Sequence, residues 1–128
     1  MNSPSSVEAL LFAVSGFLND DLLATLKGAD AFNVRVCLRA IGIAQREFKL
    51  KNALELAETK RLTALLKTNG SLEELRKALC SRIADDEFTE NIPELHAHLW
   101  ATIVGQLEID QPTYSTYREV IRNLTAIP

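Results

Sequence analysis

The chain has 128 residues and a mass of 14.2 kDa, with 47% hydrophobic and 24% charged residues and a formal net charge of -3. The apolar fraction is too high for a disordered segment, and the length suits one ordinary domain. Five glycines and four prolines exclude collagen-like and linker-like chains. The composition therefore indicates one soluble globular domain.

The start of the chain lacks the features of a secretory signal. The first basic residue is Lys27, and the apolar run over residues 9–14 is followed by small polar residues. No segment approaches the roughly 20 apolar residues of a membrane-spanning helix. We therefore expect a cytoplasmic protein without membrane contact.

In that reducing compartment Cys37 and Cys80 should be free thiols that pack as small hydrophobic side chains, with a regulatory disulfide as the alternative.

Charge is unevenly distributed along the chain. Residues 1–34 carry one base and four acids (net -3), residues 35–82 carry eleven bases and five acids (net +6), and residues 83–128 carry two bases and eight acids (net -6). The mild overall acidity argues against a nucleic-acid partner, because such binding needs clustered basic charge. The segregation suggests that the acidic ends fold over the basic middle.

Apolar residues recur at spacings of three and four, and no stretch alternates as a strand would. Capping and turn signals, among them Ser5 with Glu8, Ser71 with Glu74, and Pro93, place the helix starts. The predicted helices run from Ser5 to Leu18, from Asp30 to about Leu50, from Asn52 to about Thr68, from Ser71 to Ala84, from Pro93 to about Ile109, and from about Thr113 to Leu124.

Between the first two helices we expect a break over residues 19–21 and then a short helix or turn ended by Gly28; a stop at Asn69 and Gly70 should precede the fourth helix. Because the connections are short, neighbouring helices should be antiparallel. The sequence thus predicts an all-α fold: a single-domain up-and-down helical bundle of five to six helices over residues 1–128. Its core should cover about residues 6–112, with a short C-terminal helix over 113–124.

The predicted second helix has an unusual distribution of side chains. Arg35, Arg39 and Arg46 fall on one side of it together with Gly42, and none has an acid three or four positions away. Apolar residues cover well over half of its circumference, which is typical of a central helix. The apolar residues are Phe32, Val34, Val36, Cys37, Ala40, Ile41, Ile43, Ala44, Phe48 and Leu50.

An unpaired buried guanidinium costs several kcal/mol, so these arginines must face water, acids of another element or a bound anion. Exposure, or tertiary pairing with acids such as Glu8 and Asp110, is the first interpretation. The second is a pocket for a phosphate or carboxylate in the space left by Gly42. The third is contact with an acidic surface of a partner protein.

The histidines do not form a metal pair. His96 and His98 point roughly 160° apart on a helix, and Glu94 adds only one ligand beside His98. We expect them to be hydrogen-bonded or interfacial, and Trp100 to anchor the core or an interface. The chain has no nucleophile elbow, phosphate loop or dinucleotide fingerprint, so the sequence predicts no catalytic residue, no metal and no cofactor.

Several strings resemble a bacterial family of short helical proteins with a domain of unknown function. The resemblance spans about Val7 to Tyr114. It implies genes beside aminoglycoside-phosphotransferase-like kinases and acyl-CoA dehydrogenases, and hence an accessory role in acyl-CoA or related carboxylate metabolism. The strings that carry it are Ala31–Val36, Arg46-Glu47, Leu62–Leu66, Leu79–Ile83, Leu95–Thr102 and Leu107–Tyr114.

The family has no established catalytic residues. Residues that lie in these strings, together with Arg39, form the candidate set for binding an anion or a partner: Arg35, Arg39, Arg46, Glu47 and Asp110.

Three functions are compatible with the sequence. The leading one is a non-catalytic accessory protein that docks on an acyl-CoA dehydrogenase-like or phosphotransferase-like enzyme, and it predicts an exposed apolar patch or a homo-oligomeric face. The alternative is a small-molecule binding protein that holds an anionic group at the arginines. The third is an enzyme with Glu47 or His98 as base, which requires a pocket joining such a base to the arginines.

Overall fold

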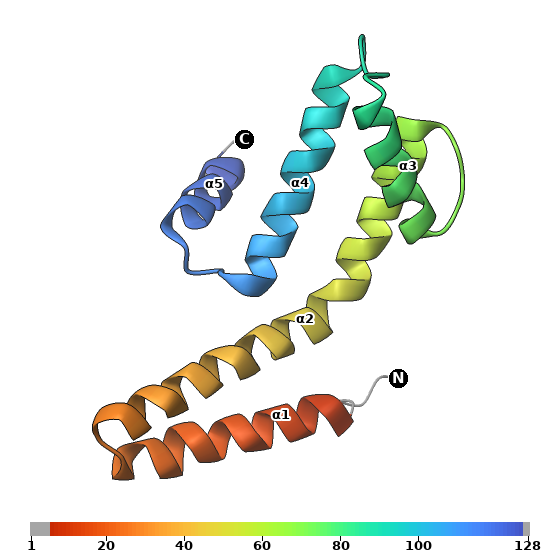
Figure 1. The fold of residues 1–128 in the computed structure, drawn as a ribbon. Helices are drawn as coiled ribbons and strands as arrows, with labels where there is room; N and C mark the ends of the chain where they lie inside the picture. The colour runs from red at the N-terminus through yellow and green to blue at the C-terminus, as the bar shows by residue number, and fades with distance from the viewer. Residues whose placement is uncertain (1–5, 127–128) are drawn as a thin grey trace. The chain divides into compact units, whose positions relative to one another are not determined.

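All regular structure in the described part of the chain is helical. The computed structural model describes residues 6–126, apart from the side chains of Thr116 and of residues 124–126. This range contains no strand, which confirms the predicted all-α class. The five α-helices are α1 (Ser6–Gly16), α2 (Gly28–Leu66), α3 (Leu72–Ala84), α4 (Ile92–Asp110) and α5 (Ser115–Ala126) (Figure 1).

The chain divides into two compact units, and the boundary falls inside α2. The hairpin unit (residues 1–49) contains α1 and the first part of α2. The core unit (residues 50–128) contains the remainder of α2 together with α3, α4 and α5. The single domain over residues 1–128 stays a prediction.

α2 is one helix of 39 residues where the sequence predicts two. Asn52, the expected cap of a third helix, lies in its interior. A cap residue starts a helix only where the preceding chain is not helical, and no glycine or proline occurs between Gly42 and Gly70 to interrupt α2. The helix ends at Leu66, three residues before Asn69 of the predicted stop, and the next residue, Lys67, has a left-handed φ of 54°.

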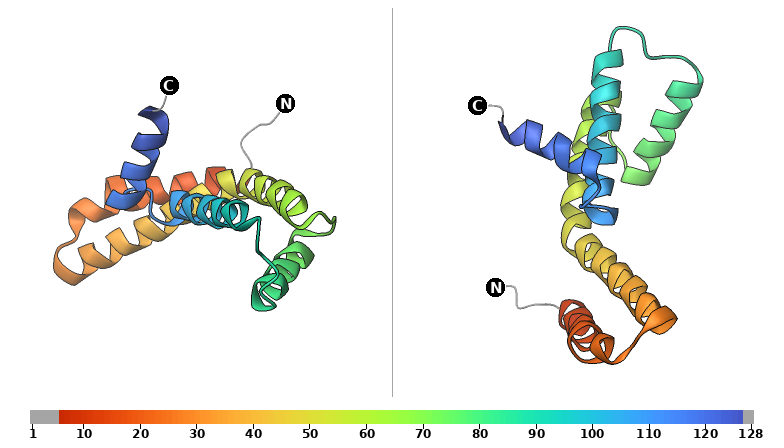
Figure 2. Two further views of the ribbon diagram at one scale, coloured as in Figure 1. Left: turned by 90° about the horizontal axis from the view of Figure 1, so that it is seen from above. Right: turned by 90° about the vertical axis from the view of Figure 1, so that its left-hand side faces the viewer.

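In the hairpin unit, α1 lies beside the first part of α2 (Figures 1 and 2). The predicted break at residues 19–21 does not occur, because α1 continues into a π-helical turn, η1 (Phe17–Leu22), and a 3-10 turn, η2 (Leu23–Thr25). Gly28 then begins α2 with a φ of 60°. A left-handed residue other than glycine costs about 1 kcal/mol or more, so Gly28 suits this reversal of the chain.

The hydrophobic core lies in the core unit. Leu62 and Leu66, one turn apart on α2, pack against Leu75 and Leu79, one turn apart on α3. Phe88 from the following loop and Leu95 from α4 complete the buried cluster. The spacing of four places each leucine pair on one face of its helix. α5 follows a turn at residues 111–114 and contacts α4.

α3 and α4 begin at the predicted signals. The Glu74 backbone N–H donates to Ser71 Oγ, and the Ser71 backbone N–H donates to Glu74 Oε1, both at 3.1 Å. These bonds form the capping box of α3. Pro93 lies in the first turn of α4. The predicted cap at Ser5 lies outside the described residues.

α4 comes close to α2 within the core unit. A Cβ atom at Gly105 would lie 3.0 Å from Leu54 Cδ2, so the absence of a side chain permits this approach. Leu95, His98, Gly105 and Ile109 are the buried residues of α4, and their spacing defines its inner face. Within residues 6–126, none of the helices is sufficiently long and apolar to cross a lipid bilayer.

Candidate functional site

The three arginines of the predicted stripe have different environments. Arg35 and Arg39 are exposed, whereas Arg46 is half-buried and lines a groove of about 560 Å³ between α1 and α2. A Cβ atom at Gly42 would lie 3.2 Å from Arg46 Nη1. Gly42 therefore makes room for the guanidinium of Arg46 itself, in the space where an anion was predicted. Glu8 lines the same groove.

The remaining two candidate residues belong to different units. Glu47 is an exposed residue of α2 in the hairpin unit. Asp110 belongs to the core unit, where it is the last residue of α4 and accepts a hydrogen bond from Gln106 Nε2 at 2.8 Å. The candidate set is thus divided between the two units, and neither unit holds all of it.

Large apolar side chains of the hairpin unit are exposed. Four of them recur every three or four residues and form a stripe along α1 and into η1, which we call the α1 stripe: Val7, Leu10, Val14 and Phe17. On α2, Phe32 and Val36 are one turn apart and are 64% and 50% exposed. Ala31 is the single buried residue among residues 6–49. Within the hairpin unit this part of α2 is not central, because α1 covers only one side of it. A central place in the whole fold stays a prediction.

Two further predictions concern packing. Cys37 and Cys80 are free, as predicted, but both are exposed and so do not pack as buried hydrophobic side chains. Trp100 is also exposed, and it does not anchor the core.

A cluster of polar side chains joins α2 to α4 in the core unit. Arg61 Nε donates to His98 Nδ1, and Arg61 Nη2 donates to Thr102 Oγ1, both at 3.1 Å. The Thr102 hydroxyl donates in turn to the backbone oxygen of His98 at 3.0 Å. His98 is 4% exposed. We call these three residues the Arg61 cluster, and its bonds confirm the expectation that His98 is hydrogen-bonded.

The geometry defines the protonation of His98. Because Nδ1 accepts a hydrogen bond, the proton of the neutral ring is on Nε2. Burial lowers the pKa of His98, and the adjacent charge of Arg61 lowers it further, while Glu58 has the opposite effect. A protonated ring would also place an N–H against the N–H of Arg61. His98 is therefore neutral near pH 7.

Glu58 lies three residues before Arg61 on α2, a spacing that favours an ion pair within a helix, but the two side chains do not pair. The carboxylate of Glu58 instead accepts two hydrogen bonds from Arg76 of α3, from Nε to Oε2 at 2.8 Å and from Nη2 to Oε1 at 2.7 Å. These bonds lower the pKa of Glu58, although burial acts in the opposite direction. In the part of the chain that the structure describes, no carboxylate lies within ion-pair distance of Arg61.

A pocket of about 680 Å³ lies beside the Arg61 cluster, entirely within the core unit. Its walls come from α2, from α4 and from the loop before α4. The lining includes apolar side chains (Ala64, Leu65, Ala97), two bases (Arg61, Lys67), two acids (Glu90, Glu94) and the uncharged His98, Asn91 and Thr89. No three His, Cys, Asp or Glu side chains among residues 6–126 are grouped so that they could hold a metal ion.

Sequence reasoning did not identify this pocket. The spacing of four between His98 and Thr102 was visible, and it does place both on one helix face. Nothing in the sequence, however, identifies Arg61, which is 37 residues before His98, as their common donor.

A family model matches residues 24–114 of the chain. The chain belongs to the DUF6285 family. The description of this family is a domain of unknown function, which confirms the resemblance seen in the sequence. The DUF6285 match includes all of α2, α3 and α4, and thus every residue of the Arg61 cluster, whereas α1 and α5 lie outside it. No curated protein and no solved structure matches the chain.

Proposed function

We propose that this DUF6285 protein is a non-catalytic accessory protein whose hairpin unit docks on a partner protein. The observation that carries the proposal is the exposure of large apolar side chains on both helices of the hairpin unit. A contiguous exposed apolar surface on a small protein is typical of an interaction site. The α1 stripe provides one such surface.

A second surface on α2 adds charge to the apolar contact. Phe32, Arg35, Val36 and Arg39 are all exposed, and their spacings of three and four make them neighbours on one face. We call this set the α2 patch. Two apolar side chains beside two guanidinium groups suit a partner surface that is apolar and has carboxylates at its rim.

The free energies of burial indicate that binding a partner needs both the α1 stripe and the α2 patch. Complete burial of one Val, Leu or Phe side chain contributes about 1.5–3 kcal/mol. Because the six apolar side chains of these surfaces are only about half exposed, their further burial contributes about 5–9 kcal/mol in total. Association itself costs about 4–15 kcal/mol. The apolar contact alone supports weak binding, and the arginines of the α2 patch supply the additional stabilisation.

The partners that we propose are the acyl-CoA dehydrogenase-like and phosphotransferase-like enzymes implied by the family resemblance. A link to acyl-CoA metabolism is part of this proposal. A second copy of the chain, with two hairpins forming a four-helix bundle, is the alternative occupant. An anion pocket at Arg35, Arg39 and Arg46 has less support, because the guanidinium of Arg46 fills the space beside Gly42.

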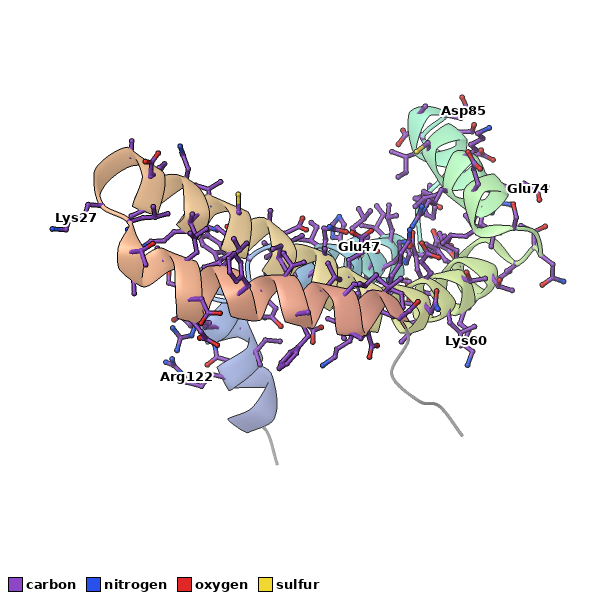
Figure 3. All side chains as sticks on the ribbon, turned by 90° about the horizontal axis from the view of Figure 1, so that it is seen from below. Lys27, Glu47, Lys60, Glu74, Asp85 and Arg122 are labelled. Atoms are coloured by element: carbon purple, nitrogen blue, oxygen red, sulfur yellow. The ribbon has the colours of Figure 1, made fainter. Side chains whose placement is uncertain are left out.

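The test measures binding of the full chain to each purified enzyme by calorimetry, and the mass of the protein alone by light scattering. Phe32→Ser should weaken binding about tenfold or more, and Arg35→Glu should weaken it and reduce its salt dependence. Lys27→Glu is the matched control for charge, because Lys27 is exposed in the turn before α2 (Figure 3). A protein that stays monomeric and binds neither enzyme would overturn the proposal, as would binding that both patch variants leave unchanged.

A further inference from the structure

The core unit contains a guanidinium that is held in place by neutral groups. Both acceptors of Arg61, His98 Nδ1 and Thr102 Oγ1, are uncharged, and Nη1 takes part in neither of these hydrogen bonds. The carboxylate of Glu58, three residues earlier on α2, is occupied at both oxygens by Arg76. Arg61 is thus a half-buried, fixed cation whose positive charge is not matched by any carboxylate at ion-pair distance among the described residues.

The pocket beside Arg61 has the size and lining of a small-molecule site. Its volume of about 680 Å³ is within the range of about 300–1,000 Å³ that such sites occupy. Arg61 lies on α2 and Lys67 directly follows the last residue of that helix, so the pocket extends along the C-terminal part of α2. Between them, Ala64 and Leu65 of α2 and Ala97 of α4 provide apolar wall.

The charges of the lining select the class of ligand. The two bases, Arg61 and Lys67, are balanced by the two acids, Glu90 and Glu94, and His98 is neutral. A dianionic phosphate or a polyanionic nucleotide would be repelled by both acids. A single carboxylate at Arg61 would receive charge-assisted hydrogen bonds from its guanidinium, which is already held in one orientation.

We propose that the pocket binds a small organic monocarboxylate, with its carboxylate on the guanidinium of Arg61 and its apolar chain against Ala64, Leu65 and Ala97. The function of Arg61 is to bind the carboxylate, and His98 and Thr102 are positioning residues that orient it. This site lies entirely within the core unit, so it does not depend on docking by the hairpin unit.

The probe is 4-methylpentanoate, and 4-methylpentanamide is its neutral analogue of nearly the same shape. Both are titrated into the full chain at constant ionic strength while NMR spectra record the imidazole signals. The carboxylate should shift the His98 signals saturably, with a Kd on the order of 1 mM for so small a ligand. The exposed His96 ring provides an internal reference that should not shift. The amide should bind at least about tenfold more weakly.

Variants test the role of Arg61. Arg61→Gln should weaken binding of the carboxylate about tenfold or more. Lys60→Gln is the matched control, because it removes the same charge from the neighbouring, outward-pointing residue (Figure 3) and should leave the Kd unchanged. If Arg61→Gln does not fold, Arg61→Lys keeps the charge without the two-point hydrogen bonding, and binding should weaken several-fold.

Three results would overturn the proposal. The first is an equal affinity for the amide and the carboxylate. The second is a shift of the His96 signals as large as that of His98. The third is tighter binding of inorganic phosphate than of 4-methylpentanoate, because a dianion should be repelled by Glu90 and Glu94.

Discussion

Arg76 of α3 holds both carboxylate oxygens of Glu58 on α2, through two hydrogen bonds of 2.8 and 2.7 Å. The side chain of Glu58 is 11% exposed and that of Arg76 is 51% exposed. This ion pair links α3 to α2 beside the hydrophobic core. It also removes the acid that would otherwise pair with Arg61 on the same helix, so that Arg61 hydrogen-bonds to His98 and Thr102 of α4.

Arg76→Gln should lower the free energy of unfolding by about 2 kcal/mol, because it leaves the Glu58 carboxylate buried without its counterion. Breaking a fully buried pair costs about 3–5 kcal/mol, and the exposure of Arg76 reduces this value. Urea unfolding at neutral pH measures the change. Lys77→Gln, at the next and exposed position, is the control and should change stability by less than about 0.5 kcal/mol. Equal effects of the two substitutions would contradict the prediction.

The same pair should contribute to acid sensitivity. The folded pKa of Glu58 lies below its ordinary value of 4.5, so the unfolded chain takes up the proton first as the pH falls. The stability from the pair is present above about pH 4.5 and is lost as the pH falls through the lower, folded pKa. In Arg76→Gln the loss of stability over this range should be smaller. Urea midpoints at a series of acidic pH values test this expectation.

His98 should make the free energy of unfolding depend on pH in a second range, which is less acidic than that of Glu58. Its folded pKa lies below 6.5, so the unfolded chain is protonated first, and stability should fall as the pH drops from about 6.5 toward the folded pKa. His98→Asn should remove this dependence, because the Asn Oδ1 can replace Nδ1 as an acceptor and does not titrate. Urea midpoints measured from neutral to mildly acidic pH give the slope. His96→Asn, at an exposed position, should retain it, and a slope that persists in His98→Asn would rule out this assignment.

Gly105→Ala should destabilise the core unit by about 1 kcal/mol. The added Cβ would lie 3.0 Å from Leu54 Cδ2, and overpacking of about 1–3 kcal/mol exceeds the roughly 1 kcal/mol that alanine gains in helix propensity. In a Leu54→Ala background the same substitution should become stabilising, because the contact is absent. Gly16→Ala, with no atom within 4 Å of the new Cβ, should be neutral or stabilising. Thermal unfolding of the four variants provides the comparison.

Ser71→Ala should cost about 1 kcal/mol, the usual contribution of an N-cap side chain. It removes the acceptor of the Glu74 backbone N–H and so breaks the capping box of α3. Ser81→Ala, at an exposed position inside α3, is the control and should be neutral or slightly stabilising, because alanine is the better helix former. A loss at Ser81 as large as that at Ser71 would show that capping is not the cause.

Features that depend on neighbours in the sequence could be predicted. The capping box at Ser71 and Glu74 and the place of Pro93 follow from the chemistry of a few adjacent residues, and both are present. The inward positions of Leu62 and Leu66 follow from helical periodicity. The continuity of α2 could not be predicted from the cap at Asn52, because the same residue is compatible with a helix interior.

Features that depend on another element could not be predicted. A same-helix pair such as Glu58 with Arg61 is worth only about 0.2–0.5 kcal/mol, so the two-point contact with Arg76 across α2 and α3 is preferred. On α4, the periodicity of the apolar residues does not identify the inner face, because the apolar Leu99 and Ile103 are exposed while the polar His98 is buried. The pocket beside Arg61 depends on these contacts between helices.

The two cysteines have a practical consequence. Cys37 lies in the hairpin unit and Cys80 in the core unit, and both thiols are free and exposed. Maleimide dyes or spin labels will therefore attach to one native position in each unit without mutagenesis. Energy transfer or electron-spin measurements on the wild-type chain can then follow the separation of the two units when a carboxylate or a candidate enzyme is added.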